Sequence, residues 1–173
     1  LGSSAALSVG LIKSIASLEQ LEVSNNEVSR LANTLEERFH GSPSGLDVSV
    51  VAHNKPIIFQ KDLGASQISP SEKFTQNYTF ALIDSQKRAS TKDMVKIASK
   101  YFSSTESGEK LVRDFNQATA EMIDGLEKGP ANLVKSAMDK ACKLLESISV
   151  VPDDLKKMIN EAICLGCIAV KPT

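Results

Sequence analysis

The residues most suited to chemistry lie between His40 and Asp47, where the sequence reads His-Gly-Ser-Pro-Ser-Gly-Leu-Asp. Glycine permits a positive φ and proline fixes φ, so Pro43-Ser44-Gly45 predicts a tight turn into a new element over Leu46 to Ala52. Asp47 falls near the start of that element, where the peptide dipoles favour an ionised carboxylate. Such a carboxylate could take a proton from a substrate hydroxyl. The alternative is an ordinary helix-capping aspartate.

A second candidate lies at the start of the chain, where Gly2-Ser3-Ser4 opens an apolar run. Backbone N–H groups at a helix N-terminus bind phosphate, and a glycine lets the anion approach closely. Taken alone, a Gly-Ser-Ser sequence is usually just a helix cap. The residue chemistry of the two stretches therefore predicts a kinase-like phosphate and carboxylate site, with no indication of the substrate.

Together the two stretches resemble the GHMP small-molecule kinases, whose phosphate loop reads Pro-x-x-x-Gly-Leu-Gly-Ser-Ser-Ala-Ala. The pattern His-Gly-x-Pro-Ser-Gly-[Val/Ile]-Asp is typical of the mevalonate-phosphorylating members, and order and spacing fit along most of the chain. The resemblance implies an α+β, two-domain GHMP kinase-like fold. Its N-terminal part would be ribosomal protein S5 domain 2-like and its helix-rich C-terminal part ferredoxin-like, here truncated at both ends. Residues 1–76 would belong to the N-terminal ATP-binding, catalytic domain and residues 77–173 to the C-terminal domain.

The resemblance also implies the roles of single residues. Gly2-Ser3-Ser4 would bind the phosphates of ATP, Ser4 and Glu36 would ligate Mg²⁺, and Asp47 would be the catalytic base. Glu36 lies eleven residues before Asp47, at the offset of the family's metal-binding glutamate. Glu37 is the adjacent competitor, but one step along a helix turns about 100°, so only one of the two should face the site. Without the resemblance, Glu36 would be interpreted as a solvated surface charge.

Further contacts are implied for His40, Ser44, Gly45 and Thr91, which would bind substrate or support the site. In the family a threonine at the position of Thr91 supports the catalytic aspartate and follows Pro-Arg-Asn. This chain instead reads Arg88-Ala89-Ser90-Thr91, so the family's arginine is missing at position 89.

The function implied by the resemblance is ATP-dependent phosphorylation of mevalonate to 5-phosphomevalonate, in cytoplasmic isoprenoid and sterol precursor synthesis. One alternative is another GHMP kinase such as phosphomevalonate kinase, which would need extra basic groups. A second is a non-catalytic GHMP-like protein that binds ligand without turnover. Residues 1–173 alone are expected to be inactive, because the family's N-terminal lysine and final glycine-rich motif lie outside them. Whether the protein forms a homodimer is left open by the sequence.

The overall composition fits this interpretation. Of the 173 residues, 42% are hydrophobic, which predicts a globular protein of one or two domains. The 20 Lys and Arg nearly balance the 21 Asp and Glu, so nothing implies a nucleic-acid partner. No apolar run approaches the ~20 residues of a membrane span. The three cysteines are Cys142, Cys164 and Cys167, and the last two are predicted to be reduced core thiols, with a redox pair as the alternative.

The hydrophobic pattern predicts the elements that position the first stretches. A buried helix runs from Ser4 to about Leu18, and a second helix runs from Glu27 to Phe39. A strand is predicted at Ile57 to Phe59. Residues 61–76 are polar and are predicted to form a loop or the crossing into a second domain. Tyr78 to Ile83 is predicted to be a buried strand.

The second half of the chain is predicted to be mainly helical. Apolar stripes at helical spacing cover Met94 to Phe102, Leu111 to Leu126, and Leu133 to Ile148. A last helix should end at Gly166 as a left-handed cap, and a strand should begin at Cys167 and reach Val170.

Overall fold

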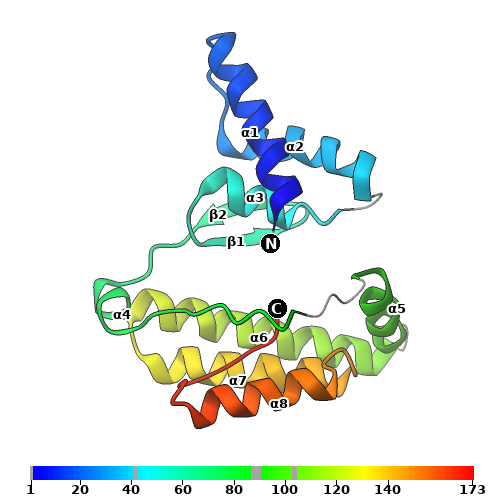
Figure 1. Cartoon of the computed structure of the whole chain (residues 1–173), viewed down its shortest axis with the longest axis vertical. Coiled ribbons are helices and arrows are strands. Elements are labelled where there is room, and N and C mark those ends of the chain that lie inside the picture. The colour runs from blue at the N-terminus through cyan, green and yellow to red at the C-terminus, as the bar shows by residue number, and fades with distance from the viewer. Residues whose placement is uncertain (1, 41–42, 87–90, 103–104) are drawn as a thin grey trace. The chain divides into compact units, whose positions relative to one another are not determined.

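A computed structural model of the chain describes residues 2–40, 43–86, 91–102 and 105–173. The described residues form eight helices and one two-stranded antiparallel sheet, a helix-rich α+β arrangement (Figure 1). They divide into two compact units, Leu1–Ser69 and Pro70–Thr173. The division falls inside the polar segment 61–76. The assignment of residues 1–76 and 77–173 to the two domains of a kinase stays a prediction.

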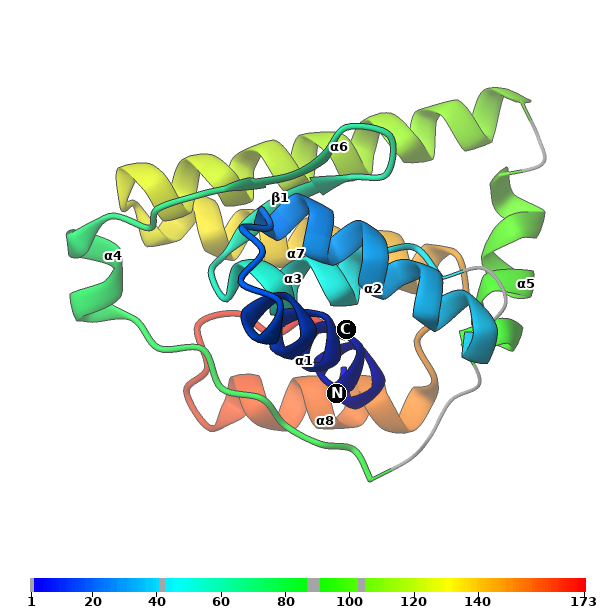
Figure 2. The same cartoon turned by 90° about the horizontal axis from the view of Figure 1, so that it is seen from above.

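The first unit packs three helices around a small core (Figure 2). They are α1 (Ser3–Leu18), α2 (Asn25–His40) and α3 (Leu46–His53). The buried core side chains are short or β-branched: Ala5, Val9, Val28, Ala32, Val48 and Ala52. Short side chains let the three helices approach closely, so the polar residues beside them are brought together as well. Lys13 Nζ donates to the carbonyl oxygen of Ala52 at 2.8 Å and places its charge at the negative end of α3.

Local sequence signals fix where α1 and α2 begin. Gly2 adopts a left-handed conformation, with φ of 64°, and its carbonyl accepts the first helical hydrogen bond from Ala6 N–H. Before α2, the Ser24 hydroxyl accepts from Glu27 N–H and the Glu27 carboxylate accepts from Ser24 N–H. This reciprocal capping box satisfies backbone donors that the helix itself leaves without partners. The predicted helices over 4–18 and 27–39 are therefore confirmed, with α2 starting slightly earlier.

A hairpin follows α3 and completes the first unit. Strand β1 (Ile57–Gln60) pairs antiparallel with β2 (Gly64–Gln67), and Ile57 lies opposite Gln67. The predicted strand at 57–59 is confirmed. The prediction of a loop over 61–76 is wrong in part, because this segment contains β2 and most of α4 (Glu72–Asn77). Gly-Ala-Ser-Gln has low intrinsic strand propensity, and pairing with β1 decides its conformation.

The second unit is helical throughout its regular elements. After α4 come α5 (Thr91–Phe102), α6 (Thr105–Lys128), α7 (Ala131–Ser147) and α8 (Asp153–Cys164). Helices α6 and α7 form an antiparallel pair joined at Gly129-Pro130 (Figure 1). They approach so closely that a Cβ at Gly125 would lie 2.6 Å from Val134 Cγ2 and 2.8 Å from Val134 N. The predicted helices of the second half are confirmed, as is the left-handed Gly166 after α8, with φ of 103°.

Two predicted strands are wrong. Residues 78–83 and 167–170 have no strand conformation, and Phe80, Leu82 and Ile83 are exposed rather than buried. A strand is stabilised by a neighbouring ladder, and in the described residues the only paired strands are β1 and β2. Local propensity alone therefore does not order these segments as strands. The first is anchored instead by the rings of Tyr78 and Phe80, which lie 5.2 Å and 5.9 Å from the buried ring of Phe74.

Helix α1 is less buried than its composition predicts. Its core-facing side carries Ala5 and Val9, but the large side chains on another side are exposed: Leu7, Leu11, Ile15 and Leu18. None of the helices in the described ranges combines the length and apolarity that a bilayer span requires.

The prediction that Cys164 and Cys167 lie in the core is wrong, whereas Cys142 is buried. Cys142 is buried in α7, and its burial, together with the nearby Glu146 carboxylate, raises the pKa of the thiol. Cys164 and Cys167 are exposed. The apolar stripe of α8 is buried at Ile159 and Ala162, but Cys164 is the last residue of this helix and Cys167 lies beyond it, so neither thiol is covered.

Candidate functional site

A buried carboxylate lies between α1 and α2. Glu36 is only 5% exposed, and both of its carboxylate oxygens accept hydrogen bonds from α1. Oε2 accepts from Ser4 Oγ at 2.8 Å and Oε1 accepts from Ser8 Oγ at 2.7 Å. Ser4 and Ser8 are one helical turn apart, so their side chains share a face of α1. The structure therefore brings together Ser4 and Glu36, the two residues predicted to ligate a metal.

Glu37 points elsewhere. Its side chain is exposed, whereas that of Glu36 is buried. This follows from the ~100° rotation between successive helical residues. Only Glu36 therefore faces α1, while the expectation that it faces the phosphate site and binds a metal stays a prediction.

The Gly2-Ser3-Ser4 segment presents an accessible helix N-terminus. Ser3 is exposed and Ser4 half-buried. A Cβ at position 2 would meet no atom within 4 Å, so the backbone there is open to an approaching group. The first N–H groups of a helix have no carbonyl partner within it, and their positive end favours an anion. Phosphate binding by this segment stays a prediction.

Asp47 lies in the first turn of α3 and is exposed. The N-cap of that helix is Gly45, with φ of 86°, so Asp47 is not the N-capping residue. Ser44 Oγ accepts from Leu46 N–H at 3.2 Å and helps to shape the turn. Val48, next to Asp47, and Ala5, next to Ser4, belong to the same core cluster. The first turns of α1 and α3, which carry the predicted phosphate-binding segment and the predicted base, therefore pack against the same core.

The turn before Asp47 also lines a hollow of about 610 Å³ beside α2 and the hairpin. Pro43, Ser44 and Gly45 form one wall, and Glu37 and Asn33 belong to the opposite helix. In the ranges that are described, the Asn33 Oδ1 is buried without a hydrogen-bond partner. A Cβ at position 45 would make only an ordinary contact with this oxygen, at 3.5 Å, so it is the φ of 86° that favours glycine at this position.

Some predicted residues cannot be placed in the site. His40 ends α2, but its side chain and residues 41–42 lie outside the described part, as do residues 88–90 and the side chain of Thr91. Thr91 begins α5 in the second unit.

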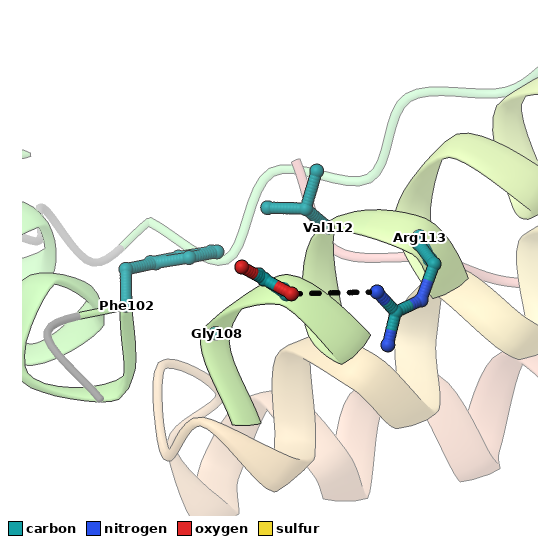
Figure 3. Close-up of a pocket in the computed structure, with 5 residues that line it drawn as sticks. Phe102, Gly108, Val112 and Arg113 are labelled. Atoms are coloured by element: carbon teal, nitrogen blue, oxygen red, sulfur yellow. Dashed lines mark ion pairs between the residues drawn. The ribbon is translucent and has the colours of Figure 1, made fainter. Parts of the chain in front are cut away.

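A second hollow, of about 440 Å³, contains none of the predicted residues. It lies where α5 ends and α6 begins, and Phe102, Gly108 and Val112 line it (Figure 3). Arg113 Nη1 and Glu109 Oε2 form an exposed ion pair 3.7 Å long at this hollow. An exposed pair of this kind contributes little to binding or stability, so the hollow has no built polar site.

Two comparisons with known proteins found a similarity. Residues 1–55 match the family model of the GHMP kinases N terminal domain. The resemblance to GHMP kinases is confirmed. The chain is also 24% identical to a protein named mevalonate kinase from Aeropyrum pernix, over 174 residues that cover 100% of the chain and 53% of the relative. The chain thus spans about half the length of this curated relative, and no solved structure matches it.

The part that matches the GHMP kinases contains Ser4, Glu36 and Asp47, whereas Thr91 lies beyond it. Sequence reasoning missed Ser8, the second donor to the Glu36 carboxylate. The signal that could have found it is its position one turn after Ser4, as a hydroxyl within an otherwise apolar stretch of helix.

Proposed function

We propose that the protein carrying this chain is a GHMP kinase that transfers the γ-phosphoryl group of ATP to a hydroxyl of mevalonate. One observation carries the proposal: a hydroxyl from α1 and a carboxylate from α2 converge at the N-terminus of α1. Phosphoryl transfer needs a phosphate cradle, a metal and a group that positions or deprotonates the attacking hydroxyl. The similarity to GHMP kinases supports ATP as donor, and the similarity to a mevalonate kinase supports the acceptor.

In this proposal Gly2-Ser3-Ser4 binds the phosphates of ATP. The N–H groups at the start of α1 point toward the anion, and the left-handed Gly2 leaves the space beside them open. His40, Ser44, Gly45 and Thr91 are assigned to substrate contacts or support of the site. The first unit would be part of the ATP-binding domain, and the second part of the C-terminal domain.

The donors at Ser4 and Glu36 suit Mg²⁺. Both are hard oxygen ligands, and Mg²⁺ typically takes one or two protein ligands, with substrate phosphates and water completing an octahedron. No cluster of three or more His, Cys, Asp or Glu that could hold a metal occurs in the described residues, which fits such a shared site better than an all-protein cage. When bound, the ion would neutralise the negative charge that develops on the transferred phosphoryl group.

Asp47 is proposed to be the base. Its carboxylate would accept the proton of the mevalonate hydroxyl as that oxygen bonds to the γ-phosphorus, while the bond from phosphorus to the β–γ bridging oxygen breaks and ADP leaves. Its exposure in the first turn of α3 leaves its carboxylate accessible to a substrate hydroxyl.

The test is ³¹P NMR of the natural-length protein with ATP and either mevalonate or 5-phosphomevalonate. We expect 5-phosphomevalonate and ADP from mevalonate. Asp47→Asn should lower the rate by ~10²–10⁴-fold, because it removes the proton acceptor. Asp47→Glu should lose ~10²-fold, since a misplacement of about 1 Å can cost that much. Asp62→Asn, an exposed aspartate in the hairpin loop of the same unit, is the control.

Three results would contradict the proposal. Turnover of 5-phosphomevalonate alone would make the protein a phosphomevalonate kinase. Binding of mevalonate without turnover would make it a ligand-binding protein. Near-normal turnover in Asp47→Asn would remove Asp47 from the mechanism.

A further inference from the structure

Ser8 makes a hydrogen bond that the proposed chemistry has not used. Its side chain is buried, with 6% of the residue exposed, and its Oγ donates to Glu36 Oε1 at 2.7 Å. Burying either group without a partner would cost free energy, because the hydrogen bonds that it makes to water would be lost and not replaced. Ser8 therefore fixes one of the two oxygens of the carboxylate that the proposed function assigns to the metal.

The two serine bonds to Glu36 differ in what a cation would do to them. A serine hydroxyl has one proton and two acceptor lone pairs. If Ser4 Oγ and Glu36 Oε2 both turned lone pairs toward one cation, the Ser4 proton would have to point away, and the 2.8 Å bond between them would be replaced. The Ser8 bond engages the other oxygen and needs no such change. It is the contact that can persist with or without the ion.

We propose that Ser8 is a positioning residue that keeps Glu36 a one-oxygen ligand and thereby favours Mg²⁺ over Ca²⁺. Ca²⁺ accepts carboxylates through one or both oxygens in flexible geometry, whereas Mg²⁺ demands a near-ideal octahedron with short bonds. With Oε1 held by Ser8, only Oε2 is presented. Without Ser8, Oε1 loses this partner and can turn toward the ion, so that both oxygens bind, which the larger ion tolerates better. This inference rests on the proposed metal role of Glu36.

The experiment measures metal binding directly in the natural-length protein with a fixed, saturating concentration of ADP. Bound Mn²⁺ is followed by electron paramagnetic resonance and displaced by Mg²⁺ or by Ca²⁺. The variants are Ser8→Ala, Ser8→Thr and Ser8→Cys. The matched control is Ser29→Ala, which removes another buried serine of the first unit that donates only to a helix carbonyl, that of Asn25, at 2.7 Å.

We expect Ser8→Ala to weaken Mg²⁺ binding by ~10–100-fold, the usual effect of removing a group that orients a metal ligand. Ca²⁺ binding should weaken less, so the preference for Mg²⁺ should fall. Ser8→Thr keeps the hydroxyl and should restore the preference. Ser8→Cys, a weaker donor of similar size, should give an intermediate value and replaces Ser8→Ala if the alanine variant does not fold. Ser29→Ala should match the parent protein.

Equal losses for Mg²⁺ and Ca²⁺ would mean that Ser8 is merely structural and would overturn the inference. So would an unchanged affinity for both ions. Glu36→Gln, measured alongside, separates the two levels of the argument. If it weakens metal binding while the Ser8 variants do not, only the role of Ser8 fails. If it leaves metal binding unchanged, the proposed metal site itself is wrong.

Discussion

The paired substitutions Glu36→Gln and Glu37→Gln test the assignment of the metal ligand most directly. The two residues are neighbours with the same chemistry, but one is buried between two helices and the other is exposed. Glutamine keeps the shape of glutamate and removes its charge. Any difference between the variants therefore reports the environment of each carboxylate and not the type of substitution.

The magnitudes follow from the contacts. In Glu36→Gln the amide can still exchange hydrogen bonds with Ser4 and Ser8, because a serine hydroxyl can donate or accept. Weaker hydrogen bonds are offset by the smaller cost of burying a neutral group, so we expect the fold to persist. Metal affinity should fall by at least ~100-fold, or about 2.7 kcal/mol, since loss of even an indirect partner costs ~10–100-fold. Glu37→Gln should change it by less than about threefold, as expected for an exposed site.

The assay is the dependence of the initial rate on Mg²⁺ concentration, with ATP and mevalonate saturating, in the natural-length protein. Circular dichroism confirms that each variant is folded. The apparent activation constant for Mg²⁺ should rise, and turnover fall, in Glu36→Gln only. Equal effects in both variants, or a larger effect of Glu37→Gln, would refute the reasoning.

Two further predictions concern the second unit and the packing of the helices. Gly125→Ala should destabilise the protein by ~1–3 kcal/mol, because the added Cβ would lie too close to the backbone of Val134. Gly10→Ala should stabilise the protein by ~0.5–1 kcal/mol, because the space around Gly10 is open and alanine has the better helix propensity. Urea unfolding of both variants checks the opposite signs. A hydrogen bond from Lys140 lowers the pKa of Glu121 from its ordinary value of 4.5. The ionised carboxylate therefore stabilises the fold above pH 4.5, and this stabilisation is lost as the pH falls through the lowered pKa. The Tm difference between the parent and Glu121→Gln should therefore be largest near neutral pH and vanish in acid; a difference that grows in acid would contradict it.

The parts of the site that the sequence could predict are those fixed by helical periodicity. The inward orientation of Glu36 and outward orientation of Glu37 follow from a single helix step, once the bounds of α2 are right. Gly45 and Gly166 are left-handed where the sequence places turns. These features depend on neighbours within a few residues, so one-dimensional patterns carry enough information for them.

The features that were missed depend on contacts far apart in the chain. The Ser8–Glu36 bond joins residues 28 positions apart, and no local pattern reports it. Tyr78 to Ile83 has strand propensity, but the described residues provide no neighbouring strand for it. Cys164 and Cys167 follow an apolar spacing, but they lie at and beyond the end of α8, where the packing that buries Ile159 and Ala162 does not reach them.

The exposed stripe of α1 has a practical consequence for work with this chain. Leu7, Leu11, Ile15 and Leu18 recur along one side of the helix and face solvent together. Contiguous apolar surface of this kind is adhesive, and its attraction persists at salt concentrations that screen charge repulsion. These four side chains, which take no part in the proposed chemistry, would thus promote self-association of the isolated 173 residues. Replacing some of them with lysine or glutamate would make the chain more soluble while leaving Ser4, Ser8 and Glu36 untouched.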